Sequence, residues 1–207
     1  MNKLIIASSF VVATQLPTLA AADERLPPYA EGQIGVGWSF VDFAAAPDHQ
    51  RAGDGYGINN GLSVMIGAQV HPSFLRRLGF GGTAHIALTG TTNDFQGRYF
   101  NPMAFNLFAT FAFIEPEWGP FVRLEGGIGG VTRKLRSEGE SGVTAIHDFG
   151  IGWSLAAGAG YRFRFARAAT FDLLATYERQ SARVERTGLP SSQWNYGVTT
   201  ITVAYVF

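Results

Sequence analysis

The sequence predicts an all-β protein, an eight-stranded antiparallel up-and-down transmembrane β-barrel, and three observations lead to this prediction. Bulky apolar residues alternate with small or polar residues in eight separate segments, which is the pattern of strands that have two different faces. Only 15% of the 207 residues are charged, against roughly 25% in a typical soluble domain. Long and short connections alternate between the segments, as they do in barrels that cross a membrane.

The first four segments cover residues 33–43, 56–70, 80–90 and 99–113. The last of them is the least regular, and Pro102 within it predicts either an upper strand end or a bulge. The bulky faces of these four segments comprise Ile34, Val36, Trp38 and Phe40, then Leu62, Val64, Ile66 and Val70, then Ala84, Ile86 and Leu88, and finally Met103, Phe105, Leu107, Phe111 and Phe113.

The second four segments cover residues 120–131, 149–163, 169–178 and 199–207. Segment 149–163 alternates most regularly, because glycine or serine follows each bulky residue in its first half. The bulky faces comprise Val122, Leu124 and Ile128, then Phe149, Ile151, Trp153, Leu155, Tyr161 and Phe163, then Phe171, Leu173 and Tyr177, and finally Ile201, Val203, Tyr205 and Phe207.

The connections predict the orientation of the barrel. Those expected to be long or polar are 44–55, 91–98, 132–148 and 179–192, and those expected to be tight turns are 71–79, 114–119 and 164–168. Short turns lie on the periplasmic side of such barrels and long loops lie outside. The same assignment places two aromatic girdles at the lipid boundaries. The members expected at the short-turn end are Trp118, Tyr161, Phe163, Tyr205 and Phe207, and those expected at the long-loop end are Phe43, Tyr56, Tyr99, Phe149 and Tyr177.

Alternation alone leaves open which face points outward. A soluble, lipocalin-like barrel would turn the bulky face inward around a ligand. However, an eight-stranded barrel is only wide enough for its interior to be filled by side chains, and this many aromatic and aliphatic residues would overfill it. The opposite face is rich in glycine, alanine, serine and threonine, which suits a narrow lumen. We therefore expect the bulky face to contact lipid, with the soluble barrel as the alternative.

The N-terminus has the features of a secretory signal peptide. Lys3 precedes a short apolar stretch that ends in Ala20-Ala21-Ala22, which fits a cleavage site of small residues. We expect a signal peptide at 1–22 and a barrel domain at 23–207, with an N-terminal membrane anchor as the alternative. The formal net charge is zero and cysteine is absent, so the composition argues against nucleic acid as a partner and excludes disulfides.

A signal peptide, eight such strands and the terminal run TVAYVF together resemble the small OmpA-like and opacity-type outer-membrane β-barrels of Gram-negative bacteria. The resemblance implies residence in the outer membrane as a monomer, in contact with membrane lipid and lipopolysaccharide. In that family the barrel-assembly machinery reads the last strand and its final aromatic residue, which implies that role for Tyr205 and Phe207.

Four charged residues fall on the small, inward face of three neighbouring segments: Arg123, Glu125, Arg162 and Asp172. Charges in a narrow lumen must pair, because an unpaired buried charge costs several kcal/mol. We expect an ionic network that plugs the lumen, and a gated polar pathway or a catalytic pair are the alternatives. Glu178 lies higher in the same face and is expected to join His85 or loop residues.

Cationic residues concentrate in the third and fourth long connections: Arg133, Lys134, Arg136, Arg183 and Arg186. They are expected either to be solvated or to bind lipopolysaccharide phosphates or a surface partner. The histidines have no metal-ligand spacing and no His-x-Ser signature of a lipid A-modifying enzyme occurs. The sequence thus favours a non-enzymatic protein without cofactor, in a structural, surface-interaction or minor small-solute permeation role. A lipid A acyl-transfer or deacylation enzyme is the alternative.

Overall fold

A computed structural model describes residues 28–42, 59–90, 99–139, 142–165, 169–186 and 189–207. For residues 59, 90, 99, 134–139, 142–147, 186 and 189–190 it describes the backbone alone. The expected signal peptide at 1–22, the start of the barrel domain at residue 23, and the girdle residues Phe43 and Tyr56 lie outside these ranges. Within the described ranges, no helix is long and apolar enough to cross a membrane.

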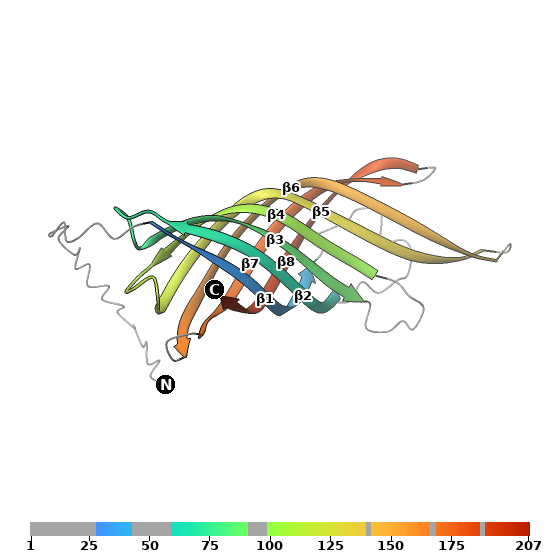
Figure 1. Ribbon diagram of the computed structural model, residues 1–207. Coiled ribbons are helices and arrows are strands. Elements are labelled where there is room, and N and C mark those ends of the chain that lie inside the picture. The colour runs from blue at the N-terminus through green and yellow to red at the C-terminus, as the bar shows by residue number, and fades with distance from the viewer. Residues whose placement is uncertain (1–27, 43–58, 91–98, 140–141, 166–168, 187–188) are drawn as a thin grey trace, which may run out of the picture.

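The described chain forms eight strands that close into one barrel (Figure 1). They are β1 (Tyr29–Asp42), β2 (Asn59–His71), β3 (Leu78–Gly90), β4 (Tyr99–Ala112), β5 (Gly119–Gly139), β6 (Gly142–Phe165), β7 (Ala169–Arg186) and β8 (Leu189–Val206). Each strand pairs antiparallel with its chain neighbour, and β1 also pairs with β8. The predicted fold class is therefore confirmed.

The bulky residues of the alternating pattern point outward. On β6, Trp153 and Leu155 keep 51% and 63% of their surface exposed, whereas Ser154 between them is 3% exposed. The same alternation runs along every strand, so the outer wall is a continuous belt of exposed large hydrophobic residues. Such a belt is stable only against hydrocarbon, because water would be in contact with all of it. The soluble, inward-facing barrel is excluded.

Barrel closure joins the two strands that are farthest apart in the sequence. Ile34 pairs with Tyr205, and below this pair the N–H of Gly32 donates to the carbonyl of Phe207 at 2.7 Å. The N–H of Phe207 donates to the carbonyl of Gly32 at 3.0 Å in return. Closure satisfies the backbone groups of both edges, which a lipid environment requires.

Aromatic rings gather at the short-turn end of the barrel, as the girdle prediction expects. Successive ring contacts of 4.7 to 6.3 Å connect neighbours on β6, β7 and β8. The rings in this series are Tyr161, Phe163, Phe165, Phe171, Tyr205 and Phe207. Trp118 lies in the β4–β5 turn with 46% of its surface exposed, so this end carries a continuous interfacial band.

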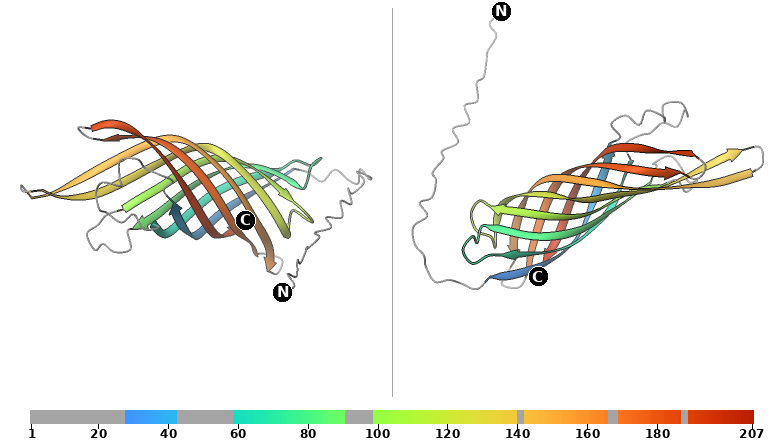
Figure 2. Two further views of the ribbon diagram at one scale, coloured as in Figure 1. Left: turned by 180° about the vertical axis from the view of Figure 1, so that it is seen from behind. Right: turned by 90° about the horizontal axis from the view of Figure 1, so that it is seen from above.

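Two of the connections that were expected to be long loops form strands, so these two predictions are wrong. The ladder between β5 and β6 continues from Arg133–Asp148 to Gly139–Gly142, across the connection predicted at 132–148. The β7–β8 ladder likewise runs through 179–192, with a bulge between Val184 and Arg186. Figure 2 shows both hairpins extending beyond the ends of the other strands. Above the membrane a strand needs no apolar face, so its charged residues give no alternating signal.

Pro102 marks neither a strand end nor a bulge. It lies within β4 and is opposite Val131 of β5, and the β3–β4 register is the same on both sides of it. The β3–β4 ladder is interrupted only between Ile86–Met103 and Thr89–Phe100. Proline has no N–H to donate to a ladder, which explains this local gap.

Candidate functional site

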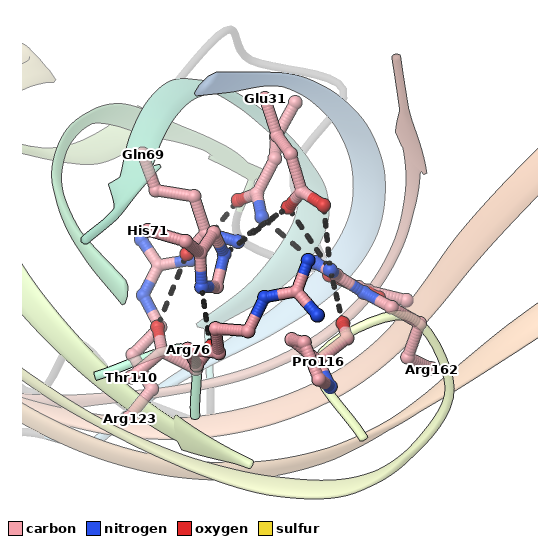
Figure 3. Close-up of polar contacts among 10 residues, drawn as sticks. Glu31, Gln69, His71, Arg76, Thr110, Pro116, Arg123 and Arg162 are labelled. Carbon is pink, nitrogen blue, oxygen red and sulfur yellow. Dashed lines mark hydrogen bonds and ion pairs between the residues drawn. The ribbon is translucent and has the colours of Figure 1, made fainter. Parts of the chain in front are cut away.

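The lumen is the candidate site, and its lower part is organised around Arg162 of β6. The guanidinium of Arg162 binds Asp172 of β7 through Nε at 2.7 Å and Nη2 at 2.9 Å. Its Nη1 donates to both carboxylate oxygens of Glu31, at 3.0 and 2.9 Å, and to the carbonyl of Pro116 at 2.7 Å. One guanidinium thus joins β1, β6, β7 and the β4–β5 turn. Figure 3 shows its contacts with Glu31 and Pro116.

Arg123 and Glu125 of β5 form a second ion pair above Arg162. The Nε of Arg123 lies 2.9 Å from Oε1 of Glu125, and its Nη1 donates to Gln33 at 3.2 Å. The Arg123 guanidinium also lies 3.5 Å from the ring centroid of Phe108, a cation–π contact. Both charged residues are at least nine-tenths buried, so each supplies the opposite charge that the other needs inside the lumen.

Four residues that sequence reasoning missed complete this lower layer. Glu31 lies 3.6 Å from Nε2 of His71 and accepts a hydrogen bond from Gln69 at 2.6 Å. Gln33 connects the two arginine clusters, because its Nε2 lies 3.5 Å from Asp172 and its Oε1 accepts from Arg123. Extending the period-two pattern of β1 below Gln33 places Glu31 on the inward face, and this signal was available in the sequence.

The middle of the lumen is polar and contains a small cavity. Glu178 accepts hydrogen bonds from Ser154 and, at 2.9 Å, from Gln180. Its Oε2 lies 3.7 Å from Nδ1 of His85, the neighbour that the sequence suggested. The centres of water molecules can occupy about 20 Å³ of this cavity, which is room for one or two waters. Its lining includes Glu125, Glu178, His85 and four threonines.

The upper part of the lumen is apolar, which the sequence analysis did not predict. A buried cluster fills it and comprises Val41, Phe100, Val131, Ala182, Val184, Trp194, Tyr196 and Val198. The ring centroid of Phe100 lies 5.2 Å from that of Tyr196, edge-on, and 6.2 Å from that of Trp194. The Tyr196 hydroxyl donates to Gln180 at 2.5 Å, so the apolar cluster rests directly on the polar layer. Below this level the inward face is mainly small and polar, with buried exceptions such as Phe108 and Phe121.

Arg133 differs from its expected role as an exposed phosphate ligand. It is buried, its Nε donates to Asp148 at 3.0 Å, and its guanidinium lies 4.3 Å from the ring of Trp194. An arginine bound in this way closes the apolar cluster and is not available to an external anion. By contrast, Arg183 is exposed and binds Ser191 at 3.0 Å. The side chains of Lys134, Arg136 and Arg186 lie outside the described part of the structure.

Among the described side chains, no group of three histidines, cysteines or carboxylates is placed to hold a metal ion. Ser154 and His85 both contact the carboxylate of Glu178, and this contact lies inside the lumen. A lipid substrate would lie on the opposite side of the barrel wall.

The closed antiparallel barrel and its outward apolar belt define a small transmembrane β-barrel of the outer-membrane type. Among solved structures, the chain is similar to Ail, the attachment invasion locus protein of Yersinia pestis, with a TM-score of 0.53 and 14% identity over 86% of this chain and 99% of that chain. It is also similar to Neisserial surface protein A, with a TM-score of 0.52 and 10% identity over 87% of this chain and 98% of that one.

A second structure of Ail, in complex with the heparin analogue sucrose octasulfate, matches with a TM-score of 0.50 and 16% identity over 86% of this chain and 99% of that chain. No protein-family model and no curated protein matches the chain. At these identities the likeness concerns the fold, which this chain shares with small outer-membrane barrels.

Proposed function

We propose that the protein is a non-conducting outer-membrane barrel with a structural or surface-interaction role at its outer end. The observation that carries this proposal is the filling of the lumen by three successive layers. The lower layer is ionic around Arg162 and Arg123, the middle layer is polar around Glu178, and the upper layer is the apolar cluster around Trp194.

Each layer opposes a permeating ion for a different physical reason. In the lower layer an ion would have to displace buried partners that are held by several charge-assisted hydrogen bonds. In the upper layer it would lose its hydration to hydrocarbon side chains, which costs far more than thermal energy. The cavity between them accommodates one or two waters and does not amount to a path.

Recordings in planar bilayers test the closed lumen. The wild-type barrel is expected to give no discrete conductance, and Arg123→Ala alone is expected to give none, because the apolar cluster still closes the lumen. The double variant Arg123→Ala with Trp194→Ala removes one residue from each barrier and is expected to conduct. Discrete wild-type conductance that Arg123→Ala alters would instead establish the alternative function, a narrow small-solute channel.

We propose the outer end for the surface-interaction role because cationic residues lie on the outward face there, directly above the apolar belt. Arg179 and Arg183 on β7 are exposed, and the backbone positions of Lys134 and Arg136 continue the outward face of β5. Arginine binds phosphate and sulfate oxygens in a bidentate manner. We therefore include lipopolysaccharide phosphates among the proposed ligands, and the heparin-analogue complex of Ail offers a precedent of similar chemistry on this fold.

Two further parts of the proposal concern biogenesis and chemistry. Tyr205 and Phe207 lie exposed on the closing strand, where we propose that the barrel-assembly machinery recognises them before the monomeric barrel closes. We also propose that the protein does not modify lipid A. Expression in a Gram-negative host should leave the lipid A mass spectrum unchanged, and a new acylated or deacylated species would overturn this part.

A further inference from the structure

The β5–β6 hairpin projects beyond the other described strands, and along both of its edges no further partner strand is found among the described residues. The last β4–β5 pair is Tyr99–Lys134, and the last β6–β7 pair is Phe149–Glu185. Beyond these, β5 and β6 pair with each other as far as Gly139–Gly142. Residues 142–147 of β6 therefore pair with no second strand among those that the structure describes. Figure 1 shows this hairpin continuing the line of the barrel wall.

The two edges of the hairpin differ in sequence. The β5 edge, residues 135–139, carries Arg136 and Glu138, and charges of this kind protect an edge from pairing. The β6 edge reads Gly-Val-Thr-Ala-Ile from residue 142 to residue 146, with β-branched residues and with neither a charge nor a proline. A stretch of this composition on an open edge is a template for another strand. Of the two edges, the β6 edge is therefore the one suited to pairing with another strand.

We propose that the β6 edge at residues 142–147 pairs antiparallel with the same edge of a second copy of this chain that is embedded in a facing membrane. In a sheet, the twofold axis that relates two antiparallel strands stands perpendicular to the sheet. The barrel wall stands upright in the bilayer, so this axis lies in the membrane plane. The axis therefore turns the second barrel upside down, and only a facing membrane can hold it.

Two observations favour a second copy as the partner. Self-pairing of residues 142–146 brings no like charges together, because this stretch has no Asp, Glu, Lys or Arg, and the two charged residues on the other edge of the hairpin, Arg136 and Glu138, are opposite in sign. The hairpin also projects far enough to meet a second copy, because the six residues of the β6 edge span about 20 Å as a strand. One such contact is short, and many copies on two surfaces would add their affinities.

Vesicle docking tests the proposal with the protein itself as the probe. The barrel is reconstituted into phosphatidylcholine vesicles, and docking is followed by energy transfer between two differently labelled vesicle populations. We expect the wild-type protein to dock vesicles and Thr144→Lys to reduce docking by tenfold or more. Ser137→Lys is the matched control, because Ser137 pairs with Thr144 across the hairpin and places the same charge on the other edge. It should dock like the wild-type protein.

A cysteine scan tests the register, which is possible because the chain contains no cysteine. A twofold axis between antiparallel strands places one residue opposite itself, whereas its sequence neighbours face different residues. Among Val143→Cys, Thr144→Cys, Ala145→Cys and Ile146→Cys, one variant should therefore form far more disulfide dimer between docked vesicles than the other three. Circular dichroism in the β region verifies that every variant has folded.

Three results would overturn the proposal: no docking above that of protein-free vesicles, equal loss of docking by Thr144→Lys and Ser137→Lys, or cross-linking that is the same at all four positions. The inference rests on the proposed surface-interaction role. Failure of the two is distinguishable, because a barrel that does not dock but also does not conduct refutes only the homotypic contact.

Discussion

Replacing Arg162 with methionine should be one of the most destabilising single substitutions in the barrel. Methionine keeps much of the length of the side chain but removes the guanidinium that binds Asp172, Glu31 and the Pro116 carbonyl. The two carboxylates then stay in a narrow, poorly hydrated lumen without their main counter-ion. Asp172 is 3% exposed and the Glu31 side chain 13%, so water does not replace the lost contacts.

The expected loss of unfolding free energy follows from these contacts. Breaking a buried ion pair by removal of one partner costs about 3–5 kcal/mol. Arg162 serves two carboxylates, and Gln69, His71 and Gln33 still solvate them in part. We therefore expect a loss of about 4 kcal/mol, measured by equilibrium urea unfolding of the barrel in phospholipid vesicles at neutral pH.

Arg164→Met is the matched control on the same strand. Arg164 pairs with Glu117, but the two side chains are 46% and 59% exposed, and exposed ion pairs contribute about 0–1 kcal/mol. The control should therefore lose less than about 1 kcal/mol. If the two variants unfold within 1 kcal/mol of each other, the lumenal network does not hold the strands together and the reasoning fails.

The remaining predictions concern the two faces and the upper layer. A Cβ on Gly152 would lie 1.7 Å from the Ser181 carbonyl oxygen, so Gly152→Ala should lose about 2 kcal/mol of unfolding free energy in the same assay. A Cβ on Gly126 would lie 3.8 Å from its nearest neighbour, a Leu155 methyl carbon. Gly126→Ala should therefore lose less than about 0.5 kcal/mol. Leu155→Arg puts a charge into the apolar belt and should cost about 2–4 kcal/mol in vesicles; a smaller cost than Gly152→Ala would contradict the lipid-facing position. Phe100→Ala should lose about 3–5 kcal/mol, and a loss below 1 kcal/mol would show that the upper cluster is loosely packed.

The membrane-spanning part of the barrel is largely predictable from the sequence. Lipid forces a period of two on every strand, so residues such as Trp153 and Ile201 reveal both the strand and its outward direction. Charged residues on the opposite face must lie in the lumen, which predicts that Arg162 and Asp172 lie there on neighbouring strands. The alternation does not, however, state which partner each charge takes, so the contact of Arg162 with Glu31 required the structure.

The outer end was not predictable in the same way, for two physical reasons. Above the membrane the lipid no longer imposes a period, and the strands at 132–148 and 179–192 resembled charged loops. The apolar cluster was missed because Trp194 and Tyr196 lie between the connection expected at 179–192 and the strand expected at 199–207, where no strand was predicted. Phe100 precedes the regular part of its strand. Several aromatic residues there face inward, whereas lower in the barrel most aromatic residues face lipid and Phe108 and Phe121 are the buried exceptions.

The outward, lipid-facing direction of the bulky side chains underlies the whole fold and the proposed function, and tryptophan fluorescence tests this direction. Two variants retain a single tryptophan each, either Trp153, which is 51% exposed on the outer wall, or Trp194, which is 4% exposed inside the lumen. In vesicles of lipids brominated along their acyl chains, we predict strong quenching of Trp153 and little quenching of Trp194. Equal quenching of both, or stronger quenching of Trp194, would contradict the account.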